Sequence, residues 1–448
     1  MNKFSKSDIL TEDMIGHLFP RERQLVPNVD DVYELEIAFL EHQSLSDVEL
    51  IRNGAYFSRI ADTFTRHFQM CTGAPLRLPD YSSSRLKSFF EKNLFRTGYA
   101  THGLFPYRGK FHPQMIKGLM NIMGLKPGDT VLDPMMGSGT VLVEAALMGI
   151  NSIGVDASPF CRFMTQTKLE ALTLPLARSQ KALTNYQEVF EYFQKKGGLP
   201  DPGTKRRWEK SDQFKKVMEK SGGYGNQSEK ERRETFHFLL LAFLDSAGYS
   251  ERSYKKPLVE QFKAVLERYL FVAEKIQNVM HGYETDIAEY QVLEGDARSL
   301  SFEDACLEGI IFSPPYSFAI DYLKNDSFHL NFFQVETDQL KKKMVGLRGR
   351  GLTQKYELYK EDMTRILSEC WRLLRPGCFC TVIVGTNNNQ LGKALNIPPD
   401  QVQGLHEIII EIGAGCGLKT VKKMSRPIIG MSNTMRREYI VFMQKESS

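Results

Sequence analysis

The chain has 448 residues, a formal net charge of +4, 42% hydrophobic residues and 25% charged residues, which is ordinary for a globular protein of two or three domains. It has no uninterrupted apolar run of about 18 residues, and MNKFSKSDIL at its start lacks a signal-peptide core. We therefore expect a cytoplasmic protein with no membrane partner. Its seven cysteines form no CxxC pair, which argues against a disulfide framework and against a zinc or other metal site.

The first part of the chain reads as helical. Apolar residues recur at spacings of three and four between about 31 and 70, and a Pro/Ser-rich connector follows at 74–84. This pattern predicts an N-terminal helical accessory region over 1–95, without a chemical signature of its own.

The next part changes to strand, glycine turn and helix. Short Val/Ile/Leu runs at 130–132 and 152–155 flank an Ala-rich helix at 140–148, and this βαβ pattern predicts a parallel sheet. Long amphipathic helical patterns occupy 171–284, and strand patterns return at 290–297 and 308–312. We expect one α/β domain, 96–170 plus 285–448, interrupted by a helical insertion at 171–284 and ending in a hairpin.

A glycine loop follows the first predicted strand. In LDPMMGSGT (132–140), Gly137 and Gly139 precede the helix, where glycine lets backbone N–H groups approach a ligand. Asp156 ends the next predicted strand, where an acid can accept both ribose hydroxyls of an adenosine-type cofactor. A P-loop is excluded because no Gly-Lys-Ser/Thr follows. A second glycine run, EIGAGCG (411–417), follows a helical pattern and is predicted to be a helix end.

The stretch IIFSPPY (310–316) places a polar residue and two prolines where another strand ends. Ligands of open α/β sheets bind beyond the carboxyl ends of the strands. Proline removes N–H donors and fixes φ, so nearby carbonyls stay rigid and free to accept. Rigid acceptors beside an aromatic ring suit a flat group that carries an exocyclic amine.

DPMMGSGT combined with SPPY resembles the amino-methyltransferases, S-adenosylmethionine-dependent enzymes that methylate N4 of cytosine or N6 of adenine in DNA. The resemblance covers roughly 100–165 and 285–445. It implies a Rossmann-like class I methyltransferase sheet with helices on both faces and S-adenosyl-L-methionine as the cofactor. The implied cofactor-binding residues are Phe111, Asp133, Pro134, Gly137, Ser138, Gly139, Thr140, Asp156 and Asp296.

Within that set, the resemblance implies that Asp133 and the two glycines line the methionine side, and that Phe111 packs near it. Asp156 would bind the ribose and Asp296 the adenine amine. The target base would be held by the catalytic residues Ser313, Pro314, Pro315 and Tyr316.

In this family Ser-Pro-Pro-Tyr occurs mostly with N4-cytosine enzymes and Asp-Pro-Pro-Tyr mostly with N6-adenine enzymes. We therefore expect transfer to N4 of a cytosine flipped out of the duplex. Three alternatives stay open: N6-adenine methylation of DNA, guanine-N2 methylation of RNA, and a catalytically silent DNA-binding subunit.

Basic residues cluster in KKKMVGLRGR (341–350), which has no acid, and several such clusters favour a polyanion partner. We expect double-stranded DNA as the partner and a prokaryotic, DNA-associated protein, and the resemblance also allows a cognate restriction endonuclease. The insertion is a candidate target-recognition region. The predicted nucleic-acid contacts are Arg108, Lys110, Phe318, Lys341, Lys342, Lys343, Arg348 and Arg350.

Overall fold

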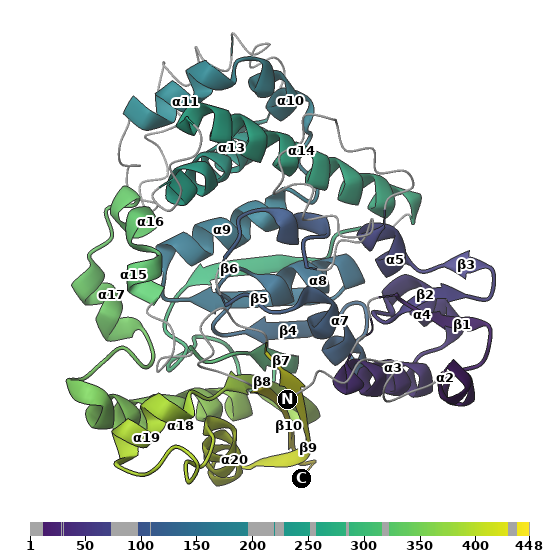
Figure 1. Cartoon of the computed structure of the whole chain (residues 1–448), viewed down its shortest axis with the longest axis vertical. Coiled ribbons are helices and arrows are strands. Elements are labelled where there is room, and N and C mark those ends of the chain that lie inside the picture. Colours follow the sequence, from purple (N-terminus) through teal and green to yellow (C-terminus); the bar gives the residue numbers. More distant parts are fainter. Residues whose placement is uncertain are drawn as a thin grey trace.

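The computed structural model describes residues 12–27, 29, 31–72, 97–107, 109–195, 219, 228–250, 257–283, 286–315, 322–428 and 437–447. A seven-stranded sheet in the order β6-β5-β4-β7-β8-β10-β9 lies at its centre (Figure 1). Its strands are β4 (Thr130–Asp133), β5 (Asn151–Asp156), β6 (Tyr290–Glu294), β7 (Leu307–Phe312), β8 (Leu374–Gly385), β9 (Leu418–Pro427) and β10 (Arg437–Lys445).

The first five strands of that order are parallel, and β10 joins β8 antiparallel before pairing with β9. Leu132 of β4 lies opposite Ile153 of β5 on one side and Ile310 of β7 on the other. The carboxyl ends of these three strands therefore meet at one edge of the sheet. The predicted α/β class, parallel sheet and terminal hairpin are confirmed.

Helices cover both faces of the sheet because alternate strand residues point to opposite sides. Val131 and Ile311 pack with α7 (Pro113–Ile122) and α8 (Thr140–Met148), whereas Leu132 and Ile310 pack with the helices of the other face. Those helices are α18 (Gly351–Leu373), α19 (Asn388–Leu395) and α20 (Leu405–Gly415). The glycine run at 411–417 lies at the end of α20, as predicted, although the helix continues through Gly415.

The described part of the N-terminal region contains helices and, in addition, a small sheet that the sequence does not predict. Its helices are α2 (Glu12–Leu18), α3 (Val32–Ser44), α4 (Asp47–Asn53) and α5 (Arg66–Cys71). A three-stranded antiparallel sheet joins them: β1 (Arg23–Leu25), β2 (Phe57–Ile60) and β3 (Thr63–Phe64). Strands this short leave no alternating pattern long enough to detect.

A buried carboxylate connects the N-terminal region with α7. Glu41 of α3 accepts the side-chain amide of Asn121 in α7 at 2.6 Å and the backbone N–H of Ala55 at 3.0 Å. Burial raises the pKa of Glu41 to about 7.

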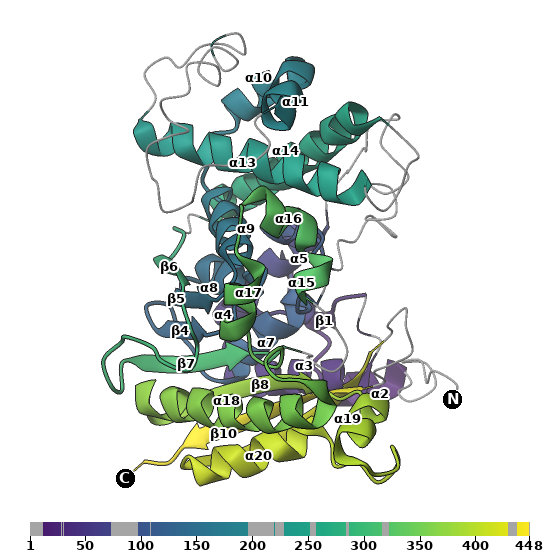
Figure 2. The same cartoon turned by 90° about the vertical axis from the view of Figure 1, so that its left-hand side faces the viewer.

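The described part of the insertion is helical. It comprises α10 (Ala177–Thr184), α11 (Tyr186–Lys195), α13 (Glu229–Ser250) and α14 (Leu258–Gly282), which lie together above the sheet in Figures 1 and 2. The α9 helix (Pro159–Glu170) lies between them and the sheet. The Tyr269 hydroxyl of α14 accepts the N–H of Phe105 at 2.9 Å, after the 3-10 turn η2 (Ala100–Gly103), which fixes the insertion to the residues that precede the glycine loop.

Three short helices follow β7 and precede α18 in the chain, and they run along one edge of the sheet (Figure 2). They are α15 (Tyr322–Asn325), α16 (Ser327–Phe332) and α17 (Thr337–Lys343). Among the described residues, no helix is long and apolar enough to cross a membrane, and no group of three or more His, Cys, Asp or Glu is placed to hold a metal ion.

Candidate active site

The glycine loop has the conformation that its glycines predict. Gly137 has φ of +48° and Gly139 has φ of +73°, a region that other residues rarely adopt. A Cβ on Gly139 would lie 2.5 Å from Cγ2 of Thr165, so there is no room for a side chain. Gly139 is also the residue before α8, which starts at Thr140. The loop therefore turns directly from β4 into a helix N-terminus.

Asp133 is fully buried where β4 ends. Its Oδ1 accepts the N–H of Met135 at 3.0 Å, and its Oδ2 has no hydrogen-bond partner among the described residues. Burial raises the pKa of Asp133 well above its ordinary value. A buried carboxylate oxygen without a donor costs free energy. A positively charged or N–H-bearing group that reached Oδ2 beneath the loop would therefore be stabilised.

Asp156 shapes the loop from the neighbouring strand. Its Oδ2 accepts the N–H of Gly137 at 2.9 Å and its Oδ1 accepts the N–H of Ser158 at 2.8 Å. Burial raises the pKa of Asp156 to about 6. Each carboxylate oxygen keeps a second acceptor position for a ligand hydroxyl.

Asp296 lies after β6 and is held by Arg298. Arg298 donates Nε to Oδ1 at 2.8 Å and Nη2 to Oδ2 at 2.6 Å. Partial burial opposes ionisation of Asp296, but the bonds from Arg298 outweigh it, so the pKa is lowered. Arg298 also donates to Asp362 at 2.9 Å, which connects this acid to α18.

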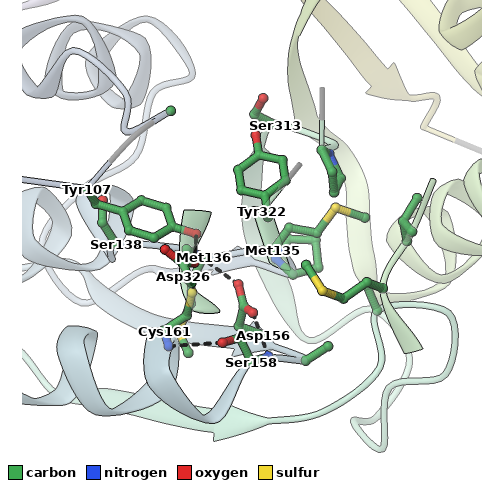
Figure 3. Close-up of a pocket in the computed structure, with 18 of the residues that line it drawn as sticks. Tyr107, Met135, Met136, Ser138, Asp156, Ser158, Cys161, Ser313, Tyr322 and Asp326 are labelled. Carbon is green, nitrogen blue, oxygen red and sulfur yellow. Dashed lines mark hydrogen bonds between the residues drawn. The ribbon is translucent and has the colours of Figure 1, made fainter. Parts of the chain in front are cut away.

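A cavity of about 110 Å³ brings these elements together (Figure 3). Of the residues predicted from the sequence, it is lined by Lys110, Phe111, Pro134, Gly137, Ser138, Thr140, Asp156, Asp296, Ser313, Pro315 and Lys343. Asp133, Gly139 and Pro314 adjoin lining residues in the chain but do not line the cavity themselves. Arg108, Tyr316 and Phe318 lie outside the described residues. The three separated sequence motifs thus form one site.

Ser313 lies directly after β7, at the edge where β4 and β5 end. Its hydroxyl donates to the carbonyl of Pro314 at 3.4 Å. The Pro314 carbonyl therefore lies beside a hydroxyl that lines the cavity. That arrangement suits an amine, which offers two N–H donors.

Several cavity residues were not singled out from the sequence. Tyr107 donates its hydroxyl to Asp326 at 3.3 Å, and the thiol of Cys161 donates to Tyr107 at 3.5 Å (Figure 3). Tyr322 of α15 and Met135 of the glycine loop line the same cavity. The sequence signal for Tyr107 and Tyr322 is only that they lie close to the recognised motifs, in GLFPYRGKF and SPPYSFAIDYLKND.

The predicted nucleic-acid contacts divide into two groups. Lys341, Lys342 and Lys343 in the last turn of α17 and Arg350 before α18 are exposed, and the described residues include no ion-pair partner for them. Lys343 also lines the cavity.

Lys110, which also lines the cavity, and Arg348 are bound to groups of the protein instead. Nζ of Lys110 donates to the carbonyls of Thr97 at 2.8 Å and His102 at 3.0 Å, and burial lowers its pKa to about 8. Arg348 forms an ion pair with the buried carboxylate of Asp362. Both arrangements favour a structural role over the phosphate contact expected for these two residues.

The parallel sheet, glycine loop and strand-end acid define a Rossmann-like α/β domain. Residues 104–194 match the family model described as "RMKL-like, methyltransferase domain". The resemblance to methyltransferases that the sequence predicts is confirmed for this part of the chain.

Two curated relatives are Type II methyltransferases. M.MjaII of Methanocaldococcus jannaschii is 32% identical over 172 residues, which cover 38% of this chain and 28% of the relative. M.BsoBI of Geobacillus stearothermophilus is 24% identical over 286 residues, which cover 54% of each chain. The chain thus spans about half or less of these relatives.

A transfer-RNA enzyme and a solved structure are also similar. The tRNA (guanine(10)-N2)-dimethyltransferase of Methanothermobacter thermautotrophicus is 42% identical over 52 residues, 12% of this chain and 16% of that protein. A SAM-dependent methyltransferase structure from Methanosarcina mazei covers 72% of this chain and 95% of its own, at 11% identity and a TM-score of 0.31.

Proposed function

We propose that the protein is an S-adenosylmethionine-dependent DNA methyltransferase that acts on the exocyclic N4 amine of cytosine. One observation carries the proposal: the glycine loop, Asp156, Asp296 and the Ser313–Pro315 turn line a single cavity. The two Type II methyltransferase relatives support DNA as the substrate.

The cavity has groups that fit the cofactor. Asp156 has acceptor positions for the ribose hydroxyls, and Asp296, kept ionised by Arg298, has one for the adenine amine. The unpartnered Oδ2 of Asp133 lies under the loop, on the side proposed for the methionine part. Bound S-adenosylmethionine would supply a methyl group on a positively charged sulfur, which leaves as a neutral thioether.

The protein's own task is to prepare the amine. The lone pair of a base amine is delocalised into the ring, which makes it a poor nucleophile. The Ser313 hydroxyl oxygen and the Pro314 carbonyl can each accept one N–H, which localises the lone pair and fixes its direction. No cysteine is required, since the nucleophile is the nitrogen itself.

The target amine is paired inside a duplex, so the base must be flipped out at a cost of a few kcal/mol. The exposed lysines of α17 lie beside the cavity and would hold the phosphates, at an affinity that falls with salt. Tyr316 is proposed to stack on the flipped base. A partner nuclease and the prokaryotic assignment stay predictions.

A transfer assay with methyl-labelled S-adenosylmethionine tests the substrate class. Genomic DNA, transfer RNA and a protein mixture are offered separately to the same preparation. We expect label in DNA. Because the transfer-RNA enzyme is similar over 52 residues, RNA is the competing substrate, and label in RNA alone would overturn the proposal.

A further inference from the structure

A second cavity, of about 550 Å³, lies at the same edge of the sheet as the candidate active site. It is formed by the turn after β8, the loop before α20 and the first residues of β10. None of the motifs discussed above includes its lining residues. Asn388 and Asn389 of α19, His406 of α20 and two residues of β10 line it together with these loops.

The strand register places this cavity relative to Ser313. Phe312, the residue before Ser313, pairs with Val382 of β8, and β8 continues to Gly385, which pairs with Glu438 of β10. At ~3.3 Å per residue along a strand and ~4.8 Å between strands, the cavity begins ~10 Å further out and up to ~10 Å sideways. Both cavities therefore lie at the carboxyl-terminal edge of the parallel strands, within reach of neighbouring nucleotides of one nucleic-acid strand.

A rigid aromatic ring lines the cavity. Tyr439 of β10 is half-buried, and His406 of α20 stacks on it with ring centroids 3.5 Å apart and planes 6° from parallel. The N–H of Leu405 donates to Oγ1 of Thr386 at 2.8 Å, which ties α20 to the turn after β8. The ring is thus fixed before any ligand arrives, which lowers the entropy lost on stacking.

Four of the other lining residues are polar or charged and exposed, namely Asn388, Asn389, Asp400 and Arg437, and Pro399 and Val402 add apolar surface. The amide of Asn389 has no hydrogen-bond partner among the described residues, while that of Asn388 donates to the carbonyl of Pro399 at 3.3 Å. Asp400 and Arg437 also line the cavity. Asn and Asp side chains recognise the amine-bearing edges of bases, and Arg binds guanine or phosphate. The carboxylate of Asp400 disfavours a free phosphate as the sole ligand, and the number of polar groups disfavours an apolar one.

We propose that this cavity is a second nucleotide site, which takes a base of the DNA strand next to the target nucleotide. The proposal rests on the proposed function and deepens it, because it assigns part of the sequence preference to four lining residues, Asn389, Asp400, Arg437 and Tyr439. Tyr439 supplies the stacking surface, Asn389 and Asp400 contact the base edge, and Arg437 contacts its phosphate.

Photo-cross-linking tests the site directly. Duplexes that the wild-type enzyme methylates are prepared with 4-thiothymidine at each position within three nucleotides of the methylated base and irradiated with the protein. We expect a cross-linked peptide that contains Asn388–Asn389 or Tyr439 for at least one position. Cross-links that all map outside this cavity, on DNA that is methylated, would overturn this inference and leave the proposed function intact.

A matched pair of variants gives the energetic test. Asn389→Ala should lower the methylation rate at subsaturating DNA about tenfold, with S-adenosylmethionine binding unchanged. Gln403→Ala removes an exposed amide of the neighbouring loop that does not line the cavity and should leave the rate unchanged. Equal rates for both variants would contradict the inference, whereas no transfer to DNA by the wild type would contradict the proposed function itself.

Discussion

Arg298 binds both carboxylate oxygens of Asp296, with Nε 2.8 Å from Oδ1 and Nη2 2.6 Å from Oδ2. The same guanidinium donates to Asp362, which forms an ion pair with Arg348. Arg298 also donates to the carbonyls of Lys342 and Lys343 at 3.4 and 3.3 Å. One side chain therefore fixes Asp296, which lines the cavity, and the end of the basic helix α17.

Replacing Arg298 by Lys should weaken S-adenosylmethionine binding about tenfold, because lysine cannot reproduce the two-pronged hold on Asp296. Isothermal titration calorimetry measures the change. Arg372→Lys is the matched control, since Arg372 binds Glu369 and Asp304 away from the cavity. Equal affinities of the two variants would show that Arg298 does not orient Asp296.

Cofactor affinity should fall as the pH drops through about 6. Burial raises the pKa of Asp156 to about 6, so the carboxylate is ionised above that pH and becomes protonated below it. The protonated acid loses charge and one acceptor position for the ribose. Affinity measured from pH 8 to pH 5 should decline for the wild type and be weaker but flatter for Asp156→Asn. A wild-type affinity that is constant over this range would remove Asp156 from the proposed ribose site.

Gly139→Ala should destabilise the fold more than a glycine substitution that is strained only in its backbone. Gly139 combines φ of +73° with a Cβ position 2.5 Å from Thr165, whereas Gly124 has φ of +78° and nothing within 4 Å. Backbone strain of this kind costs about 1–2 kcal/mol, so Gly124→Ala should lose about that much in urea unfolding. Gly139→Ala should lose more, and a smaller loss than in Gly124→Ala would contradict the tight contact with Thr165.

Ser313→Ala should lower kcat about 100-fold while S-adenosylmethionine binding stays the same, because it removes an acceptor that acts on the reacting amine. Single-turnover kinetics with labelled cofactor separates the two effects. Ser327→Ala, which removes an exposed hydroxyl bonded only to the carbonyl of Lys324 among the described partners, is the control. Full activity of Ser313→Ala would exclude the serine from the chemistry.

The parts of the site that the sequence predicts are those carried by short continuous motifs. Gly137, Gly139 and Asp156 are recognisable because strand, glycine turn and helix occur in a fixed order, and Ser313 because prolines end a strand. Tyr107, Tyr322 and Asp326 come from other elements and join the cavity only through tertiary packing. No periodicity or spacing connects Tyr107 with Asp326 across more than 200 residues.

The charged residues of the sequence predicted exposed contact residues less well than the motifs predicted the cavity. Arg348 and Lys110 count as exposed cations in the sequence, yet the fold binds one to Asp362 and the other to two backbone carbonyls.

The N-terminal sheet was missed for a different reason. Its strands are three, four and two residues long, too short for alternation to be visible.

The central claim is that the Ser313–Pro315 turn activates the N4 amine of cytosine. The most direct measurement is nucleoside analysis by mass spectrometry of DNA methylated in vitro with labelled S-adenosylmethionine. We predict that the label appears as N4-methylcytosine in the digest. Label found only as N6-methyladenine would contradict the base assignment, and the absence of any labelled nucleoside from DNA would contradict the account as a whole.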